Sequence, residues 1–394
     1  MPPSPIWVAD TATLPFTMTK HENLLMVADS EHDANMLYAV GTFVPDPFIY
    51  LSTSGRPLIV MSDLEIDRAR AQAPHCRVAS LGQYQQKLRA QGILRPGFAH
   101  VVRQILREKG IRRVTVPDNF PLGLATDLEK LGIPVKARPG NFFPEREIKS
   151  AAEVRKISAA LVMAEVGMAE AMQVLRTAKI GRDHRLLYHN VPLTSEKLRS
   201  VIDCAILQAS GLAANTIVAG GRQACDPHER GYGPLRAHEP IIIDIFPRSQ
   251  KTGYFGDITR TVVRGRASEA VGKLYDTVLR GQNIAFRKIR ANVPTGDAHR
   301  AVQEFFEQQG YKTRRHNGRM EGFFHGTGHG LGLEIHESPR VGANSTGKLR
   351  PGHVVTVEPG LYYPEIGGVR LEDVALVTTN GARNLTRFEK VLEI

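Results

Sequence analysis

The residues most able to carry chemistry gather toward the C-terminal end of the chain. Three histidines (His325, His329 and His336) stand among glycines and short apolar runs in the segment HGTGHGLGLEIHE. Glu358 follows in the run VEPG, and Glu372 in the run RLED. Imidazole nitrogens and carboxylate oxygens are ligands that hard and borderline divalent metals accept. The spacing therefore indicates a metal site, provided that these side chains converge in the fold.

Two further carboxylates stand upstream, on a predicted β-hairpin. Asp244 follows three isoleucines, Asp257 precedes the β-like run ITRTVV, and a turn rich in Pro, Ser, Lys and Gly joins them. A carboxylate at the end of an apolar strand is largely desolvated, so it needs a cation or strong donors. Taken alone, each aspartate could instead be a turn or cap residue. With His329, Glu358 and Glu372 they make five ligands for a pair of metals, which suggests activation of water for hydrolysis.

Other polar residues flank these ligands. Arg370 and Glu372 are two residues apart on a predicted strand, so their side chains face the same way. The guanidinium can hold that acid or a substrate carboxylate, and an ordinary cross-strand charge pair is the alternative. Beside a metal, His325 and His336 can bind a peptide carbonyl or shuttle protons.

The elements that must position these residues form an α+β region. Ser150-Ala-Ala-Glu153 is a capping-box pattern, and apolar residues then recur at three-, four- and seven-residue spacing up to Leu175, which predicts one long helix. Helices are also predicted over 268–290 and 299–309. Strands are predicted over 241–246, 257–263, 354–358 and 369–377. We therefore expect an antiparallel sheet covered by helices.

The first part of the chain, residues 1–145, has a different pattern. Two short apolar runs, 47–52 and 57–61, are separated by Ser-Gly-Arg and predict a hairpin. A helix is predicted from Asp63, a strand over 114–117 and a helix around Asp127. This alternation favours an α/β domain with a mostly parallel sheet. The run RPGNFFP, rich in Pro and Gly, marks the boundary with residues 146–394.

Composition sets wider limits. At 394 residues the chain exceeds one typical core, which favours two domains. Its three cysteines (Cys76, Cys204 and Cys225) are widely spaced, so they predict no disulfide framework and fit a reducing cytoplasm. The N-terminal run MPPSPIWVAD lacks the pattern of a signal peptide, and no apolar run approaches the roughly 20 residues that cross a bilayer. We expect no membrane partner.

The formal net charge of +11 invites a nucleic-acid interpretation. The Lys and Arg residues are nevertheless scattered among acids, with short clusters such as Arg112-Arg113 and Arg314-Arg315, and no basic stripe is interleaved with aromatics. We therefore expect a solvated basic surface and no nucleic-acid partner.

Taken in order, the motifs resemble those of the pita-bread metallopeptidases, a family that includes aminopeptidase P, prolidase (Xaa-Pro dipeptidase), methionine aminopeptidase and the metal-free creatinase. The resemblance covers roughly residues 145–394. It rests on the segments Asp244-Ile, Gly256-Asp257-Ile-Thr-Arg-Thr, His325 to Pro339, Val357-Glu358-Pro-Gly-Leu-Tyr362 and Gly368-Val-Arg370-Leu-Glu372-Asp. Residues 1–145 resemble, through weaker motifs, the creatinase-type N-terminal domain. This layout favours the aminopeptidase P and prolidase branch.

The resemblance implies a pita-bread catalytic domain over residues 146–394 that holds two divalent metals. The implied ligands are Asp244, Asp257, His329, Glu358 and Glu372. In that scheme Asp257 and Glu372 bridge both metals, a metal-bridging hydroxide attacks the scissile carbonyl, and Glu358 accepts the proton.

The same resemblance implies roles for the flanking residues. His336 and His228 would steady the substrate and the tetrahedral intermediate, His325 would line the pocket, and Arg370 would orient Glu372 or bind substrate. His228 rests only on its position sixteen residues before Asp244, and a surface-loop histidine is the alternative. The implied substrate is a peptide with proline at its second position, and the implied assembly is a homodimer.

One departure from the family pattern concerns the hairpin. Asp244 and Asp257 are thirteen residues apart, whereas the family's usual spacing is two residues shorter. A longer turn within 246–253 can absorb the difference, since loop length costs little free energy.

Several alternatives stay open at the level of sequence. The substrate could be an Xaa-Pro dipeptide or the N-terminus of a longer peptide, and an oxygen-rich site with one imidazole accepts Mn, Co, Zn or Fe. Cleavage of a non-peptide amide, or a lyase reaction, is possible on the same metal scaffold. A non-catalytic peptide-binding module and a metal-free creatinase-like enzyme are disfavoured, because all five ligands are present.

Overall fold

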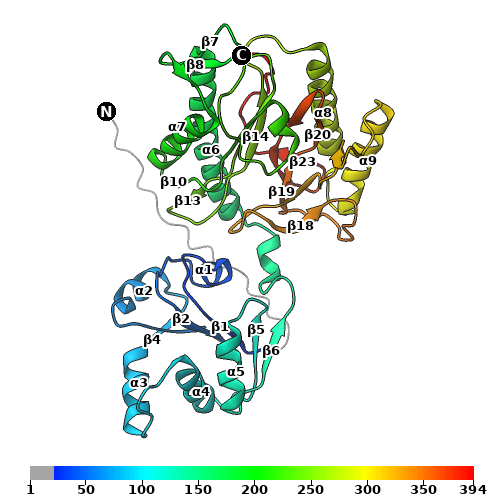
Figure 1. Ribbon diagram of the computed structural model, residues 1–394. Helices are drawn as coiled ribbons and strands as arrows, with labels where there is room; N and C mark the ends of the chain where they lie inside the picture. The colour runs from blue at the N-terminus through cyan, green and yellow to red at the C-terminus, as the bar shows by residue number, and fades with distance from the viewer. Residues whose placement is uncertain (1–21) are drawn as a thin grey trace, which may run out of the picture. The chain divides into compact units, whose positions relative to one another are not determined.

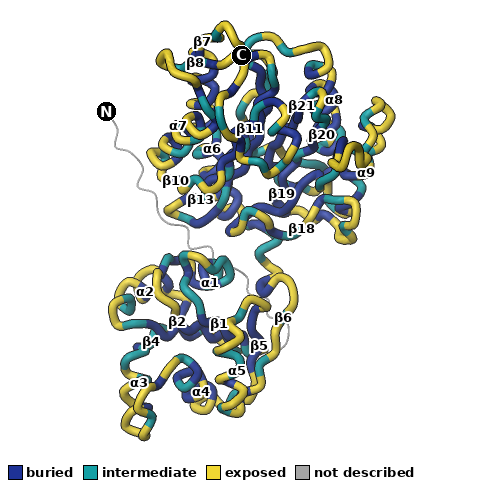
Figure 2. The backbone as a smooth tube through the Cα atoms, in the orientation of Figure 1, coloured by how far each residue is buried: buried dark blue, intermediate teal, exposed yellow. Residues whose placement is uncertain are grey.

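A computed structural model describes residues 22–394. They form two compact units, of which the first ends at Phe142 and the second begins at Phe143. The sequence placed this boundary three residues later, after residue 145. Buried residues line the interior of each unit (Figure 2). The interpretation of the run MPPSPIWVAD concerns a segment outside the described residues.

The first unit is an α/β layer around a six-stranded sheet (Figure 1). The strand order is β4-β3-β2-β1-β5-β6, and three of the five neighbouring pairs are parallel, namely β3–β4, β1–β5 and β5–β6. The predicted mostly parallel sheet is therefore confirmed. Its strands are β1 (Leu24–Ala28), β2 (Phe48–Ser52), β3 (Leu58–Met61), β4 (Arg77–Ser80), β5 (Val114–Pro117) and β6 (Val135–Arg138). Its helices are α1 (Ala34–Val40), α2 (Ile66–Gln72), α3 (Leu81–Ala90), α4 (Phe98–Glu108) and α5 (Leu122–Lys130).

Apolar strands and helix faces account for this layer. β2 and β3 pair as the predicted antiparallel hairpin and are buried along their whole length, which is typical of strands in a sheet covered on both faces. α4 packs an apolar face, which includes Val101 and Ile105, against the same core. The helix predicted from Asp63 begins at Ile66, and the helix predicted around Asp127 is α5.

The second unit is α+β, and its paired strands run antiparallel as predicted. A five-stranded sheet has the order β18-β17-β19-β22-β23, and a three-stranded sheet has the order β11-β12-β14. Contacts of β14 with β22 join the two sheets, and β12 also contacts β21 of a separate two-stranded sheet. The strands of these sheets are β11 (Ile217–Gly220), β12 (Ile241–Ile245), β14 (Ile258–Val262), β17 (Gly328–Gly330), β18 (Glu337–Val341), β19 (Val354–Val357), β22 (Asp373–Val377) and β23 (Ala382–Asn384).

Smaller sheets complete the unit. β20 pairs with β21, β10 with β13, β15 with β16, and β8 with both β7 and β9. Their bounds are β7 (Lys179–Ile180), β8 (Leu186–Tyr188), β9 (Val191–Pro192), β10 (Gly211–Leu212), β13 (Arg248–Ser249), β15 (Arg314–His316), β16 (Arg319–Glu321), β20 (Gly360–Tyr363) and β21 (Gly367–Arg370). The short 3-10 helices are η1 (Pro144–Glu147) and η2 (Gly221–Cys225).

Two pairs of helices cover the sheets (Figure 1). α6 (Ala151–Thr177) and α7 (Ser195–Gln208) share a core with β12 and β14, whereas α8 (Glu269–Lys288) and α9 (Thr295–Gln308) share one with β19 and β22. Ser268 caps α8, so the helix predicted over 268–290 is confirmed with slightly shorter bounds. α9 starts four residues before the predicted position, directly after Pro294.

α6 is the predicted long helix, and Ser150 and Glu153 form its capping box. By length and composition alone it could also cross a bilayer, although charged residues interrupt its apolar runs. Half of its most apolar window is buried inside the unit, and Ile157, Leu161 and Met168 belong to the buried set. That burial is typical of a core helix.

The hairpin that carries the two aspartates has the predicted form. β12 pairs with β14, with Asp244 opposite Thr259. The long connection between the strands is ordered: β13 pairs with β10, Ser249 and Gly253 close a tight turn, and Gly253 has a φ of 76°. The extra residues of this turn are therefore built into a small sheet.

The strand predicted over 369–377 is wrong as a single element. β21 ends at Arg370 and β22 begins at Asp373, so Leu371 and Glu372 lie in a break between two different sheets. The Glu372 N–H donates to the Thr259 carbonyl instead of to a neighbour in either sheet. The β-like pattern of VRLEDVALV does not reveal this change of partner.

Candidate metal centre

The five predicted ligands lie where the two main sheets of the second unit meet. Asp244 is within β12, Asp257 directly precedes β14, and His329 is in the middle of β17. Glu358 directly follows β19, and Glu372 fills the break before β22. Four of the five therefore stand at or beside a strand end, where side chains leave the regular alternation of the sheet.

Glycines allow the backbone to approach closely around these ligands. A Cβ atom on Gly328, beside His329, would lie 1.9 Å from the Thr356 carbonyl oxygen. A Cβ atom on Gly256, beside Asp257, would lie 2.5 Å from backbone atoms of Ala160 on α6. Larger residues would push β17 and β14 away from their neighbours, which explains why glycine precedes each ligand.

The structure brings Asp257, His329 and Glu372 together. One ligand atom from each lies within 4.8 Å of the others, and all three residues are buried. His329 Nε2 is 3.7 Å from Asp257 Oδ2 and 3.2 Å from Glu358 Oε1. His329 Nδ1 donates to the Gly330 carbonyl at 3.1 Å, which fixes the ring with Nε2 facing the carboxylates.

Asp244 lies near this group, since its charge raises the pKa of Asp257, and it pairs with Arg370. Arg370 donates from NH2 to Asp244 Oδ2 at 2.9 Å and from NH1 to the Tyr362 hydroxyl at 3.0 Å. The link from Arg370 to Glu372 runs through Thr259: Arg370 Nε donates to Thr259 Oγ1 at 3.4 Å, and Thr259 Oγ1 donates to Glu372 Oε2 at 2.8 Å. The orienting role expected of Arg370 stays a prediction.

The donor set fits divalent metal ions. Asp244 Oδ1 and Glu372 Oε1 are buried and have no hydrogen-bond partner among the described residues. Buried carboxylate oxygens without donors are costly, and a cation would satisfy them. One imidazole and several carboxylates are ligands suited to Mn, Co, Zn or Fe.

Electrostatics indicate the same need for a cation. Burial raises the pKa of Asp257 well above its usual range, and the charges of Asp244 and Glu358 raise it further. Burial also raises the pKa of Glu372, with added repulsion from Asp257. Asp244 has a raised pKa for the same first reason, although Arg370 opposes the shift. Like charges at this spacing destabilise the ionised group unless positive charge is added.

Glu358 behaves differently. Burial alone would raise its pKa, but the hydrogen bond and charge of His329, with smaller contributions from His325 and Arg370, lower it to about 2. Thr356 Oγ1 also donates to Glu358 Oε1 at 3.1 Å. Glu358 is therefore ionised at neutral pH.

The three other predicted histidines lie at different distances from this group. His325 Nε2 accepts from the Tyr362 hydroxyl at 2.9 Å, and burial lowers its pKa to about 4. The His336 ring packs edge-on against His329 with centroids 4.4 Å apart; desolvation and then the charge of His329 lower its pKa to about 4. Both rings are neutral at pH 7.

His228 occupies an exposed loop after η2. Its backbone N–H donates to Asp226 Oδ1 at 3.4 Å. Among the contacts of the described residues, none joins the His228 side chain to a candidate ligand, and its charge is the last of the causes that lower the pKa of His336.

Sequence reasoning missed residues that support the ligands. Thr259 bonds Glu372, Thr356 bonds Glu358, and Tyr362 links Arg370 to His325. Thr259 and Tyr362 belong to the motif segments themselves, two and four residues after a ligand, and that adjacency is the signal that could have found them.

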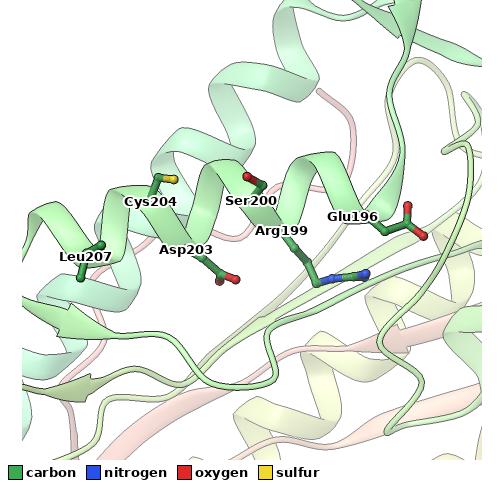
Figure 3. A pocket seen from close by; sticks show the side chains of 6 residues that line it. All are labelled: Glu196, Arg199, Ser200, Asp203, Cys204 and Leu207. Carbon is green, nitrogen blue, oxygen red and sulfur yellow. The ribbon is translucent and has the colours of Figure 1, made fainter.

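A shallow depression on α7 is separate from this site. It has a volume of about 390 Å³ and lies along one helix, with Glu196, Arg199 and Cys204 among its lining residues (Figure 3). None of the candidate ligands lines it.

Comparisons with known proteins agree with this geometry. Residues 155–379 match metallopeptidase family M24, and this range includes all five candidate ligands. An Xaa-Pro dipeptidase from Pyrococcus horikoshii is 31% identical over 294 residues, which cover 72% of this chain and 76% of that protein.

Two solved structures are similar in fold. An Xaa-Pro dipeptidase from Bacillus anthracis has a TM-score of 0.78 at 22% identity and covers 95% of both chains. An X-Pro aminopeptidase from Thermotoga maritima has a TM-score of 0.79 at 20% identity and covers 94% of this chain and 98% of that chain. The pita-bread fold expected from the sequence is confirmed. The chain, with its buried carboxylates and imidazole in the matched segment, belongs to metallopeptidase family M24 and is a peptidase.

Proposed function

We propose that this peptidase hydrolyses Xaa-Pro peptide bonds with two divalent metal ions held by the five candidate ligands. The convergence of Asp257, His329 and Glu372 within 4.8 Å, in a buried position, carries the proposal. The name of the Pyrococcus horikoshii relative supports the choice of Xaa-Pro bonds.

The side chains divide naturally between two ions. His329 and Glu358 are paired at 3.2 Å, and Asp244 is paired with Arg370 at 2.9 Å, so we assign the two pairs to different ions. By the resemblance, Asp257 and Glu372 would serve both ions. Burial and nearby like charges raise the pKa of each, so each would be stabilised by a cation. Mn, Co, Zn and Fe all suit this donor set.

When bound, the metal ions would lower the pKa of water and polarise the scissile carbonyl. Glu358 is ionised and would accept the proton released as the water attacks. Thr356 holds one oxygen of Glu358 in place, so the proton has a fixed acceptor.

Neutral imidazoles would handle the substrate. His336 is uncharged at pH 7, so it can donate one hydrogen bond to a peptide carbonyl without repelling the metals. His325 is also uncharged and would line the pocket, because its Nδ1–H already donates to the Gly326 carbonyl at 2.8 Å. His228 would act from the loop beside them. Arg370 holds Asp244 and presents its positive charge to the cluster, where it can also meet a substrate carboxylate.

The wider setting belongs to the same proposal. A cytoplasmic homodimer that binds neither nucleic acid nor membrane fits the resemblance, the scattered basic residues and the three free cysteines. Dipeptides and longer peptides are both compatible with the site.

A cleavage assay by mass spectrometry tests the proposal. Chelator-stripped protein is reloaded with Mn²⁺ or Co²⁺ and given an Xaa-Pro dipeptide and a matched Xaa-Pro-Xaa tripeptide. Asp257→Asn should abolish cleavage, because it removes a ligand charge from the centre of the cluster. The exposed Asp276→Asn, on α8, is the matched control and should leave cleavage unchanged.

The outcomes separate the candidate reactions. Metal-dependent cleavage of the dipeptide alone means a dipeptidase, and cleavage of the tripeptide means an aminopeptidase. If neither peptide is cleaved while two metals are bound, the Xaa-Pro proposal fails, and a non-peptide amide or a lyase substrate becomes the next hypothesis.

A further inference from the structure

A buried glutamine stands behind the metal ligands. Gln282 is on α8 and is only 1% exposed. Its neighbours on the same helix face, Leu274, Val278 and Ala285, are apolar members of the core. A polar amide in such surroundings is costly unless it is hydrogen-bonded, so its partners indicate why it is there.

The Gln282 amide bonds two backbone segments at once. Nε2 donates to the Val357 carbonyl at 2.9 Å and to the Leu371 carbonyl at 3.1 Å. Val357 directly precedes Glu358, and Leu371 directly precedes Glu372. The two N–H groups of one side chain therefore fix the backbone next to two candidate metal ligands.

Both glutamates leave the regular sheet at this point. Val357 and Asp373 are the last paired residues of the β19–β22 ladder, so the ladder no longer sets the separation of the segments that follow and precede them. On the other side, the Glu358 N–H donates to the Thr327 carbonyl at 2.8 Å, and the Glu372 N–H donates to the Thr259 carbonyl at 3.0 Å. Gln282 completes this set of backbone contacts from behind.

We propose that Gln282 is a positioning residue that sets the spacing between Glu358 and Glu372 for metal binding. It touches neither carboxylate among the described contacts and acts through the backbone that carries them. The inference rests on the proposed metal site, although it does not depend on which peptide is cleaved. Outer partners of metal ligands typically contribute 10- to 100-fold to metal affinity or activity.

The test compares two changes in the same helix. Gln282→Met keeps the length of the side chain but removes both donors. Val278→Ala is the matched control. Val278 is fully buried in the same core, and its side chain has no donor that could bond the Val357 or Leu371 carbonyl. Gln282→Asn, which keeps the amide but draws it back by one methylene, is a second variant should Gln282→Met fold poorly.

Three measurements are made on each full-length variant: thermal unfolding of the chelator-stripped protein, Mn²⁺ affinity by calorimetry, and kcat and KM on the cleaved peptide. We expect Gln282→Met to weaken Mn²⁺ binding by about 10- to 100-fold and to lower kcat more than it changes KM. Val278→Ala should lower the unfolding temperature and leave Mn²⁺ affinity within about twofold, because a core cavity lies outside the ligand geometry.

Two results would overturn the inference in favour of simple core stabilisation. One is a Gln282→Met variant that binds Mn²⁺ as tightly as the wild type, and the other is a Val278→Ala variant that loses as much Mn²⁺ affinity as Gln282→Met. Protein that binds Mn²⁺ with the expected difference between variants, yet cleaves no Xaa-Pro peptide, would contradict the proposed reaction and leave the positioning role standing. Wild-type protein that binds no metal would overturn both.

Discussion

Two groups of buried carboxylates in the second unit have opposite surroundings. Glu337, at the start of β18, is paired with Arg146 at 2.6 Å and Lys149 at 2.8 Å, and it also accepts the backbone N–H groups of Leu333 and Glu334. Asp257 and Glu372 instead face other acids, and an oxygen of Glu372 has no donor among the described residues.

The pKa values follow these surroundings. Burial would raise the pKa of Glu337, but the charges of Lys149 and Arg146 outweigh it and lower the pKa. The pKa values of Asp257 and Glu372 are raised well above their usual range. Burial is common to both groups, so the positions of the cations account for the difference. Glu337 is neutralised by cations of the chain itself, whereas Asp257 and Glu372 would be stabilised by a positive charge from outside the chain.

The two groups are also linked in space. Glu337 adjoins His336 in sequence, and its bonds to Leu333 and Glu334 fix the loop that leads to this histidine. A satisfied carboxylate thus holds the loop beside an unsatisfied cluster.

Removal of Glu337 should cost the most stability. In Glu337→Ala the nearly buried cations of Arg146 and Lys149 would lose this carboxylate. The loss is expected to lower the free energy of unfolding by about 3–5 kcal/mol. Urea unfolding measures the loss. Glu334→Ala is the control, because Glu334 also pairs with Arg146 but its side chain is 57% exposed. An equal loss in both variants would contradict the special role of the buried partner.

Neutralising a metal ligand should instead raise the free energy of unfolding of the metal-free protein. Glu372→Gln removes one of several like charges and keeps an acceptor for Thr259, so we expect a gain on the order of 1 kcal/mol in unfolding free energy in the presence of a chelator. With saturating Mn²⁺ the wild type should become the more stable protein. Glu365→Gln, in an exposed turn, makes the same charge change as a control. Destabilisation by Glu372→Gln in chelator would contradict the electrostatic comparison.

Glu337 and Glu372 should also make stability depend on pH in opposite directions. Glu337 has a lowered pKa in the fold, so its contribution is fully present above the unfolded pKa of about 4.3 and is lost as pH falls through the folded value. Glu372 has a raised pKa, so its penalty is absent in acid and grows as pH rises above about 4.3.

Urea unfolding of wild type, Glu337→Gln and Glu372→Gln in chelator, from about pH 3 to pH 8, measures both trends. The stability advantage of wild type over Glu337→Gln should shrink below about pH 4, and the advantage of Glu372→Gln over wild type should shrink there as well. Differences that do not change with pH would show that neither carboxylate titrates as its surroundings require.

An exposed ion pair should contribute least. Lys273 and Glu269 pair on the outer face of α8, with side chains 69% and 82% exposed. Lys273→Ala is expected to leave the thermal unfolding temperature unchanged, because water and salt screen such a pair. A clear decrease would show that ion pairs stabilise this protein wherever they occur, and the contrast between buried and exposed carboxylates would lose its force.

Local sequence patterns predicted much of this architecture. The capping box and apolar spacing after Ser150 define α6, and the alternation of β-like runs with polar turns defines the hairpin of β12 and β14. These features depend on neighbours a few residues apart, so a single sequence contains them. The types of the five ligands, and their order along the chain, were readable for the same reason.

The break at Leu371 and Glu372 was not readable, because VRLE alternates apolar and charged side chains and leads on to the β-like run VALV, as one strand would. Only the competition between two sheets for this segment turns Glu372 toward Thr259 and gives Arg370 to Asp244, 126 residues away in sequence. Gln282 likewise looked like an ordinary helix residue.

Residue types and local patterns therefore specify which side chains can bind metal and most of the helices and strands around them. Tertiary structure decided which carboxylates are satisfied and which are not. Glu337 finds Arg146 and Lys149 about 190 residues away, at the start of the same unit, whereas Asp257 and Glu372 meet further acids. Such pairings depend on strand register and on contacts between distant segments, and elements formed by local propensity do not specify them.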